Sequence, residues 1–305
     1  MQQSLDGVII VDKPSNISSA KVVMIVKKLL GAQKTGHTGT LDPFATGVLV
    51  CCINRATKLA RFFLGGPKKY EGLLHLGIET DTQDLTGNIL SVNEVANISE
   101  ETIRAVFEKF EGTHAQTPPI FSALKHKGTP LYKLARMGRP VQKPPRPVTI
   151  YRLDILHIAL PFIRFEVSCS AGTYIRTLCA DLGKRLGCGG HLKELRRLEI
   201  NKFTVGAAAT LPELETLAES GKLPARVIPM AAALHGMPEL VADEDLAERV
   251  RHGKPIREKE VRHVRAAQAG MLESFLKVVS PEGELLAVIR RPEETVLYEY
   301  CCVFN

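Results

Sequence analysis

A single carboxylate stands in a glycine-rich turn of this chain. Residues 36–49 read Gly-His-Thr-Gly-Thr-Leu-Asp-Pro-Phe-Ala-Thr-Gly-Val-Leu, and Asp42 is their only acidic side chain. Pro43 fixes the backbone dihedral after it. An ionised carboxylate in such a turn can attack a substrate covalently or act as a general base. An Asp before Pro also occurs as a plain turn former, so position alone leaves both roles open.

Residues 31–38 fall short of a phosphate-binding loop. They read Gly-x-x-x-x-Gly-His-Thr, whereas the loop of nucleotide triphosphatases requires Lys where this chain has His37. The stretch also follows a predicted helix, when such a loop should follow a strand. Both differences argue against a nucleotide triphosphatase.

The seven cysteines form no metal-binding pattern. None makes Cys-x-x-Cys, and Cys188 with His191 is one isolated half-site, whereas tetrahedral zinc needs four ligands. We therefore predict buried structural cysteines and no metal. An odd cysteine count suits a reducing compartment, and the first six residues lack a secretory pattern, so we expect a cytoplasmic protein. The apolar run 48–53 is too short to cross a membrane.

Positive charge gathers in one part of the chain. The 305 residues hold 40 Lys and Arg against 33 Asp and Glu, a net charge of +7. Residues 121–204 hold 16 against 5, a net of +11, whereas residues 241–305 hold 10 against 12, a net of −2. This asymmetry indicates a polyanion partner, although a solvated basic face has the same composition. Because Trp is absent, base stacking would depend on Tyr, Phe, His or Arg.

Strands and helices are interleaved in a way that predicts an α+β fold. Ser18 or Ser19 can cap the first helix, and Ser99 alone can cap another. A boundary near residue 238 separates a helix-rich part from a tail of alternating strands. The expected strands are 8–11, 48–53, 70–78, 148–159, 162–169, 274–279, 285–289 and 296–300. The expected helices are 18–30, 57–64, one opening at 99, 173–186 and 228–234, and residues 31–47 are expected to form a loop.

Residues 112–147 differ in composition from the segments on either side. They contain seven Pro, few apolar runs and several basic side chains. A loop of this length inside a compact domain is usually functional or mobile. We therefore predict an insertion without regular structure here.

The whole string 36–49 resembles the catalytic loop of the bacterial TruB family, the tRNA pseudouridine synthases that act on uridine 55. Other stretches resemble further motifs of that family in the same order along the chain, over residues 7–235. They are Val11-Asp12-Lys13-Pro14 with Ser18-Ser19; Lys69-Tyr70, Leu76-Gly77 and Thr80-Asp81-Thr82-Gln83-Asp84; Pro118-Pro119, Phe121-Ser122-Ala123-Leu124-Lys125, Tyr132 and Ala135-Arg136; Ser170-Ala171-Gly172-Thr173-Tyr174-Ile175-Arg176; and Leu195-Arg196-Arg197.

Two departures from the family pattern are visible. Many relatives carry Lys where this chain has Ala171, so one phosphate contact is missing. Many also carry Thr and Gly where this chain has Leu198 and Asn201. These differences concern local RNA contacts and a turn rather than the chemistry.

The resemblance implies a pseudouridine-synthase catalytic domain at residues 1–237, with a central mixed, mostly antiparallel sheet flanked by helices and an RNA-gripping insertion at about 112–147. A smaller, β-rich tail at 238–305 resembles a PUA-type RNA-binding module. The implied reaction isomerises uridine 55 in the T-loop of tRNA after base flipping. It breaks and re-forms the glycosidic bond through Asp42, and it needs no cofactor and no metal.

The resemblance also assigns supporting residues. Arg176 would form a bidentate pair with Asp42 and hold it ionised. Tyr70 would stack on the target base, and His37 would lie beside the flipped nucleotide. Tyr174, Leu195, Lys13 and Pro14 would line the pocket. The RNA-binding set comprises Lys125, Lys127, Lys133, Arg136, Arg139, Arg146, Arg196 and Arg197.

The expected partner is the T-arm and T-loop of tRNA, bound by a monomer without a membrane. A non-catalytic RNA-binding or tRNA-folding protein is the alternative function. The carboxylate of Asp42 with Tyr70 and Arg176 distinguishes the two, because a pure binder gains nothing from an acidic group among phosphates.

Overall fold

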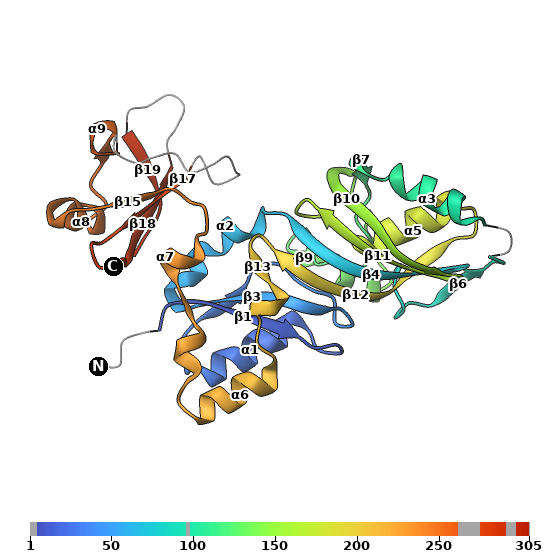
Figure 1. The fold of residues 1–305 in the computed structure, drawn as a ribbon, viewed down its shortest axis with the longest axis horizontal. Coiled ribbons are helices and arrows are strands. Elements are labelled where there is room, and N and C mark those ends of the chain that lie inside the picture. The colour runs from blue at the N-terminus through green and yellow to red at the C-terminus, as the bar shows by residue number, and fades with distance from the viewer. Residues whose placement is uncertain (1–4, 96–97, 262–274, 291–296, 305) are drawn as a thin grey trace.

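A computed structural model describes residues 5–95, 98–261, 275–290 and 297–304. It contains a ten-stranded sheet, a separate five-stranded sheet near the C-terminus and two short two-stranded pairs (Figure 1). Helices lie against the large sheet. The predicted α+β class, with a smaller β-rich unit after the large one, is therefore confirmed.

The large sheet is mixed but mostly antiparallel, as predicted. Its one parallel pairing in the described residues joins Arg196 to Thr46 and Arg197 to Gly47. The order across the sheet is β14 (Ile228–Pro229), β1 (Gly7–Lys13), β3 (Thr46–Ile53), β12 (Gly190–Ile200), β4 (Lys68–Leu76), β11 (Phe162–Cys169), β10 (Arg146–Ala159) and β7 (Gly112–Gln116), with β2 (Thr35–His37) beside β3 and β13 (Phe203–Thr204) beside β12.

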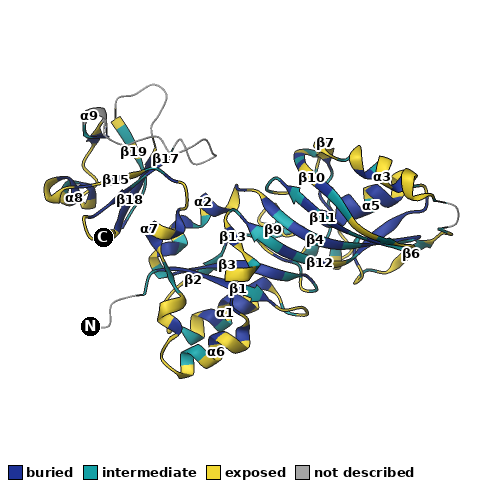
Figure 2. Cartoon of the chain, viewed as in Figure 1, coloured by how far each residue is buried: buried dark blue, intermediate teal, exposed yellow. Residues whose placement is uncertain are grey.

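Two helix pairs cover the two halves of this sheet. Helices α1 (Ser19–Leu29) and α6 (Leu211–Glu219) pack apolar side chains on β1 and β3. Helices α3 (Glu100–Glu108) and α5 (Ile175–Arg185) do the same on β4, β10 and β11. Figure 2 shows the inner strands dark and the outer faces of α1 and α6 yellow. Apolar burial between these layers is the main stabilising contribution.

Both predicted helix caps are present. The Ser18 hydroxyl accepts a hydrogen bond from the backbone of Lys21, and the Ser99 hydroxyl accepts one from Thr102. Each serine satisfies a backbone N–H that the first helical turn leaves unpaired. The predicted hairpin of β10 and β11 is also confirmed.

Several local predictions need correction. The loop 31–47 contains the short strand β2, and 57–64 is a 3-10 turn, Asn54–Leu59, followed by α2 (Ala60–Leu64). The predicted strand 70–78 is interrupted at Gly77, whose φ of +85° separates β4 from β5 (Ile78–Thr80), which pairs with β6 (Ile89–Val92). The helix predicted at 228–234 is β14 followed by α7 (Met230–Ala233).

The insertion 112–147 is more ordered than predicted. Its first residues form β7, whose ladder with β10 runs from Gly112 to Gln116 at the edge of the large sheet. A tight hairpin and one short helix follow: β8 (Lys125–His126), β9 (Thr129–Pro130) and α4 (Leu131–Arg136). Most of the prolines lie outside these elements, although Pro130 ends β9. Pairing with β10 orders β7, and the composition of the segment does not reveal that pairing.

Strand β12 has no counterpart among the predicted elements. Leu192, Leu195 and Leu198 recur every three residues, which is a helical rather than a strand period. Nevertheless the segment is extended because β4 and β3 supply its hydrogen-bond partners on both sides. Tertiary pairing therefore decided this element.

In its described residues, the C-terminal unit contains a five-stranded sheet and two short helices. The predicted strands 274–279, 285–289 and 296–300 correspond to three of its strands, with Ser274 and Val296 outside the described residues. The sheet order is β15 (Glu239–Val241), β17 (Phe275–Val279), β18 (Leu285–Arg290), β19 (Leu297–Val303) and β16 (Ile256–Arg257), accompanied by α8 (Glu244–Arg251) and α9 (Glu258–Val261).

This unit packs directly on the larger one. Phe304 is 2% exposed and joins an apolar cluster with side chains of β1, β3 and α2. Lys58 donates to the carbonyl of Val303 at 2.9 Å, and Arg61 donates to that of Cys301 at 2.6 Å. The two units therefore share part of one core.

Candidate active site

Asp42 lies in the turn between β2 and β3, and the backbone on each side of it is anchored. The Ser19 hydroxyl accepts from the amide of Leu41 at 2.9 Å and donates to its carbonyl at 3.0 Å. The Lys13 ammonium donates to the carbonyl of Pro43 at 3.1 Å. Because both flanking peptides are tied to buried side chains, the position of the carboxylate is preorganised.

Lys13 is a fully buried anchor rather than an open pocket wall. Its ammonium also donates to the carbonyls of Pro14 and Ile17. Burial lowers the pKa of Lys13 to about 8, although the nearby Asp42 opposes this shift. Pro14 itself is exposed. Of the two predicted pocket residues, Lys13 and Pro14, Lys13 therefore supports the backbone of the catalytic loop.

Arg176 connects three distant segments of the chain. It is 4% exposed near the start of α5, and its Nε lies 2.9 Å from Oδ2 of Asp42. Its Nη1 lies 3.3 Å from Oδ2 of Asp84. The remaining donors bind the carbonyls of Thr82 and Phe121, each at 2.8 Å. The predicted contact with Asp42 is confirmed, but it is made by one nitrogen and is not bidentate, because the other nitrogens are engaged elsewhere.

Asp84 is a site residue to which sequence reasoning gave no role. It is 4% exposed, and besides Arg176 its carboxylate accepts hydrogen bonds from the Thr82 hydroxyl at 2.8 Å. It also accepts from the amide and hydroxyl of Thr86, at 2.9 and 2.6 Å. The only signal in the sequence was its place in the polar run 80–84. One guanidinium is thus shared between two carboxylates.

The pKa of Asp42 is raised above its ordinary value. Burial is the largest cause, and the negative charge of Asp84 adds to it, while the ion pair with Arg176 and the charge of Lys13 oppose it. We had expected Arg176 to hold Asp42 ionised, and burial and Asp84 act against that ion pair. The side chain remains 35% exposed, so a substrate can reach it. A raised pKa makes the carboxylate a stronger base once it is ionised.

Tyr70 lies on β4 in the same apolar cluster as Leu41, Ala45 and Leu195. The ring is 7% exposed, and its residue pairs with Arg197 across the β4–β12 ladder. Burial raises the pKa of Tyr70, and the positive charge of Arg197 opposes that shift. The phenol is therefore protonated at neutral pH. Tyr70 and the predicted pocket residue Leu195 form the apolar floor beside the catalytic loop.

His37 lies on β2, opposite Cys51. Burial and the charge of Arg197 lower the pKa of His37, so its ring is neutral at physiological pH. Its buried Nδ1 has no hydrogen-bond partner among the described residues. The ring can therefore stack or accept a hydrogen bond without carrying a charge.

Tyr174 is held at the entrance of α5 by Gln116, a residue that sequence reasoning missed. The Gln116 side chain accepts from the amide of Tyr174 at 2.8 Å and donates to its carbonyl at 3.0 Å. Arg146 lies over the Tyr174 ring, 5.3 Å from its centroid, and donates to the carbonyl of Gly172. Strand β7 therefore contacts the site through Gln116. Because residues 112–147 were expected to form a loop, the sequence did not indicate this contact.

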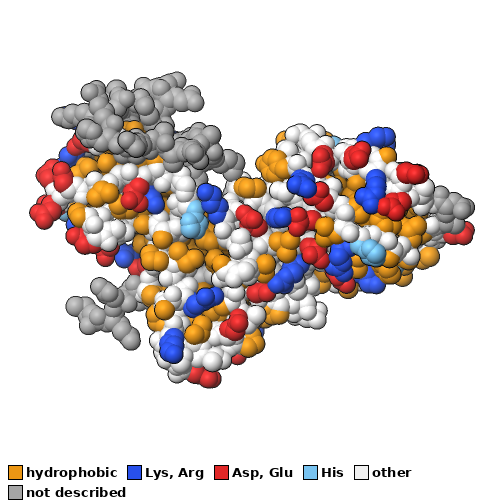
Figure 3. Space-filling model, in the orientation of Figure 1, with side chains coloured by type: hydrophobic (Ala, Val, Ile, Leu, Met, Phe, Trp, Pro, Cys, Tyr) orange, Lys and Arg blue, Asp and Glu red, His pale blue; other side chains and the backbone are white. Residues whose placement is uncertain are grey.

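The predicted RNA-binding residues divide into exposed and engaged groups. Arg196 is ion-paired with Asp12, with Nη2 2.6 Å from Oδ2. Arg146 is half-buried, as described above. Ion pairs also occupy the open face of β4, β11 and β12, and Figure 3 shows blue and red side chains next to one another there. Five basic residues are exposed on the segment from β8 onward: Lys125, Lys127, Lys133, Arg136 and Arg139.

Arg197 was predicted to bind RNA, and the structure corrects its place. It is 1% exposed, with Nε donating to the carbonyl of Val48 at 2.7 Å and Nη2 to that of Gly39 at 3.1 Å. The backbone of Arg197 lies so close to position 47 that only glycine fits there: the φ of Gly47 is +101°, and a Cβ would lie 2.2 Å from the Arg197 carbonyl oxygen. Arg197 thus fixes both ends of the catalytic loop instead of reaching a phosphate.

The described residues hold no group of three His, Cys, Asp or Glu side chains able to bind a metal ion. No helix among them is long and apolar enough to span a membrane.

Solved structures share this fold. In a structure of an H/ACA RNP bound to a substrate RNA containing 2′-deoxyuridine, the similar chain is 26% identical with a TM-score of 0.72, over 98% of this chain and 85% of that one. A Cbf5-Nop10-Gar1 complex gives 26% identity and a TM-score of 0.73 over the same shares. The fold is therefore that of the pseudouridine synthases.

Sequence comparison defines the family within that class. The N-terminal domain model of the TruB family pseudouridylate synthases matches residues 27–175, and the tRNA pseudouridylate synthase B C-terminal domain model matches residues 176–235. A tRNA pseudouridine synthase B of Dechloromonas aromatica is 44% identical, over 83% of this chain and 84% of that protein. That of Syntrophus aciditrophicus is 42% identical, over 94% and 91%. The chain belongs to the TruB family and is an isomerase.

Proposed function

We propose that this protein converts uridine 55 in the T-loop of tRNA into pseudouridine. The base is flipped out of its stack, and the glycosidic bond is cleaved and re-formed with Asp42 as the catalytic group. The N1–C1′ bond breaks and C5 of the base joins C1′; C5 then loses its proton and N1 gains one. No atom is lost and no oxidation state changes, so no cofactor or metal is required for balance.

The observation that carries this proposal is the carboxylate of Asp42 on an anchored turn. It is accessible, it is held by Arg176, and the neutral Tyr70 lies in the apolar cluster that contains the neighbouring Leu41. The carboxylate can attack C1′ or remove a sugar proton. Tyr70 supplies a π-face for the flipped base and a hydroxyl that can move a proton. His37 and Tyr174 offer two further flat rings.

Base flipping costs a few kcal/mol, and phosphate contacts must offset that cost. The exposed basic residues of the 125–139 segment are the natural donors of such contacts. We assign them to the T-arm, with Arg146 and Arg196 contributing where their present partners can be exchanged. The affinity for tRNA then falls as the salt concentration rises.

The domain assignment follows the same proposal. Residues 1–237 form the catalytic domain, and residues 238–305 form a PUA-like RNA-binding domain. We propose that the protein acts as a monomer in the cytoplasm, where its tRNA substrate and reducing conditions are found together.

The test is incubation of the full chain with an unmodified tRNA transcript and no added cofactor, followed by mapping of pseudouridine. We expect one product, at position 55. Product only at another position overturns the assignment of uridine 55, and the absence of any product overturns the enzymatic function.

The second candidate function is tRNA folding without chemistry. The exposed basic segment favours it, because opening the tRNA elbow to reach the T-loop also gives a misfolded tRNA a chance to refold. An Asp42→Asn variant separates the two functions: folding assistance would persist in it, and isomerisation would not.

A further inference from the structure

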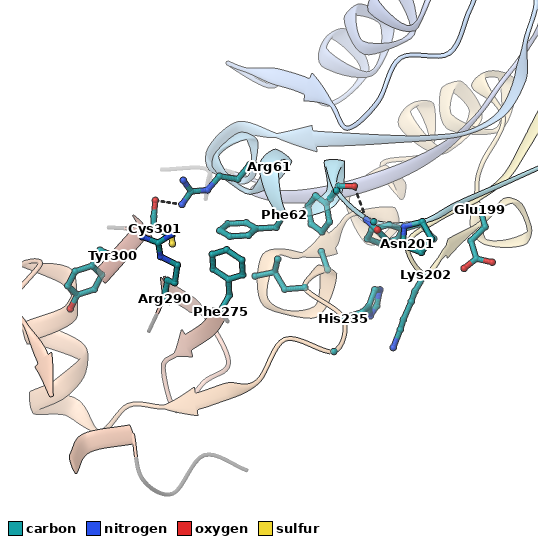
Figure 4. Close-up of a pocket in the computed structure, with 18 of the residues that line it drawn as sticks. Arg61, Phe62, Glu199, Asn201, Lys202, His235, Phe275, Arg290, Tyr300 and Cys301 are labelled. Atoms are coloured by element: carbon teal, nitrogen blue, oxygen red, sulfur yellow. Dashed lines mark hydrogen bonds between the residues drawn. The ribbon is translucent and has the colours of Figure 1, made fainter. Parts of the chain in front are cut away.

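A cavity separate from the catalytic turn lies between the two units. Its volume is about 810 Å³, and it opens at the junction of the large sheet and the C-terminal unit (Figure 4). Its walls come from α2, from the turn between β12 and β13, from the segment after α7, and from β17, β18 and β19. Asp42 does not line it. This volume falls within the range of small-molecule sites.

Aromatic side chains from both units line the cavity: His235 is exposed and Phe275 is partly exposed, whereas Phe62 and Phe203 are buried, at 8% and 2% exposed. Phe62 of α2 and Phe275 of β17 meet at 5.2 Å between ring centroids, with their planes at 78°. Phe203 and His235 meet at 5.2 Å and 60°. Figure 4 shows the Phe62 and Phe275 rings next to each other, with His235 apart from them on the side of Lys202. Aromatic side chains in such an arrangement are stacking and edge contacts for a planar heterocycle.

The charges around the opening are not equally available. Arg290 is paired with Glu299 at 2.6 Å, and Arg61 donates to the Cys301 carbonyl. Lys202 is exposed, and no hydrogen bond or ion pair to another described residue engages its ammonium. Glu199 also lines the cavity, so the anion must bind on the Lys202 side.

His235 adjoins Lys202 at this opening (Figure 4). Burial and the charges of Lys202 and Lys277 lower the pKa of His235. Its ring is therefore neutral and adds a hydrogen-bonding edge rather than a second positive charge. One free ammonium beside a group of rings matches a ligand that has one anionic group and one flat aromatic part.

We propose that this junction cavity binds one nucleotide unit, with the base against the accessible rings of Phe275 and His235 and the phosphate on Lys202. Stacking on aromatic rings tolerates any base, and Lys binds phosphate as a point charge. The unit is either a free mononucleotide or an unpaired nucleotide of a bound RNA. The RNA source rests on the proposed function, whereas the free nucleotide does not.

This site also gives the near-neutral tail a role. Residues 241–305 carry a net charge of −2, so they cannot attract RNA by charge alone. They contribute Phe275 and the Arg290–Glu299 pair, while the free ammonium comes from Lys202 in the other unit. Neither unit has the complete set of contacts.

The first experiment titrates adenosine monophosphate into the full chain by calorimetry. We expect saturable binding that weakens roughly tenfold in Lys202→Glu, since a charge-assisted phosphate contact is replaced by repulsion. Lys222→Glu makes the same charge change at an exposed position outside the cavity and serves as the matched control. Melting temperatures of both variants check that the fold is intact.

The second experiment identifies the source of the nucleotide. Unmodified tRNA transcript is titrated against the wild type, Lys202→Glu and Lys222→Glu. If the nucleotide belongs to RNA, Lys202→Glu weakens tRNA binding several-fold more than Lys222→Glu. If it is a free mononucleotide, the two variants bind tRNA alike and only adenosine monophosphate binding differs. Each result supports the site and names one source.

The proposal is overturned if adenosine monophosphate and tRNA both bind Lys202→Glu and Lys222→Glu with equal affinity, or if adenosine monophosphate does not bind and the two variants bind tRNA alike. Pseudouridine formation by the wild type is measured separately. Nucleotide binding without isomerisation would support this site and contradict the proposed function. Isomerisation without a Lys202-dependent interaction would support the proposed function and contradict this site.

Discussion

The guanidinium of Arg176 contacts the carboxylate of Asp42 through a single nitrogen, with Nε 2.9 Å from Oδ2. A bidentate pair would commit a second nitrogen to Asp42, whereas in this geometry Nη1 lies 3.3 Å from Oδ2 of Asp84 instead. Arg176 therefore orients Asp42 without fully neutralising the site. The two carboxylates compete for one cation, and the pKa of Asp42 rises in consequence of burial and of its neighbour.

We expect Asp42→Asn to lower pseudouridine formation by roughly 1000-fold or more, because the amide is neither a nucleophile nor a base of comparable strength. The substitution is nearly isosteric, so the affinity for tRNA should be retained. Product mapping and a filter-binding assay measure the two quantities. Unimpaired turnover by this variant would remove Asp42 from the chemistry.

In a plot of kcat/KM against pH, the midpoint of the acid limb is expected above a pH of about 4, which is the ordinary pKa of an aspartate carboxyl. The ionised form of Asp42 is the active one, so activity is lost as pH falls through its raised pKa. Asp84→Asn removes a charge that raises this pKa, so the limb should move to lower pH. Asp154→Asn, on β10, is the control. A shift to higher pH in Asp84→Asn would contradict the assigned coupling.

Arg176→Lys preserves the charge but not the four contacts. A single ammonium cannot also serve the carbonyls of Thr82 and Phe121, and each buried acceptor without a donor costs about 1–3 kcal/mol. We expect a lower free energy of unfolding and a loss of activity of roughly 100-fold, since Asp42 is no longer held in place. Denaturation curves and initial rates test both effects. Wild-type stability in this variant would show that the carbonyl contacts are dispensable.

Ser18 and Ser19 are adjacent but have different tasks. Ser18→Ala removes a helix cap and should cost about 1 kcal/mol of stability while turnover is retained. Ser19→Ala removes both hydrogen bonds to Leu41 and should lower kcat about tenfold as well, because the catalytic turn loosens. Equal kinetics of the two variants would mean that the Leu41 anchor does not position Asp42.

Lys127 and Arg197 were both predicted to bind RNA, and the structure separates them. Lys127→Ala should weaken tRNA binding and reduce the slope of log affinity against log salt by about 1. Arg197→Lys should leave that slope unchanged and instead lower the melting temperature, because the Gly39 and Val48 carbonyls lose their donor. Binding in a salt series and thermal unfolding distinguish the two. A reduced slope in Arg197→Lys would restore its RNA contact.

The sequence by itself determined the family and the order of most elements. Caps at Ser18 and Ser99, the hairpin of β10 and β11, and the strands of the tail depend on contacts between near neighbours, which local patterns reveal. The turn around Asp42 was also recognisable, because tight glycine-rich geometry demands particular residue types in a fixed order. The contact between Asp42 and Arg176 followed from the resemblance.

Only the tertiary structure decided what depends on partners far along the chain. Strand β12 is extended because β3 and β4 pair with it, although its leucines have a helical spacing. Arg197 is a basic residue in a basic stretch, yet it is buried and its guanidinium donates to the carbonyls of Val48 and Gly39. The pKa of Asp42 rises instead of falling, because burial and Asp84 outweigh Arg176, and no local pattern carries the sum of those long-range interactions.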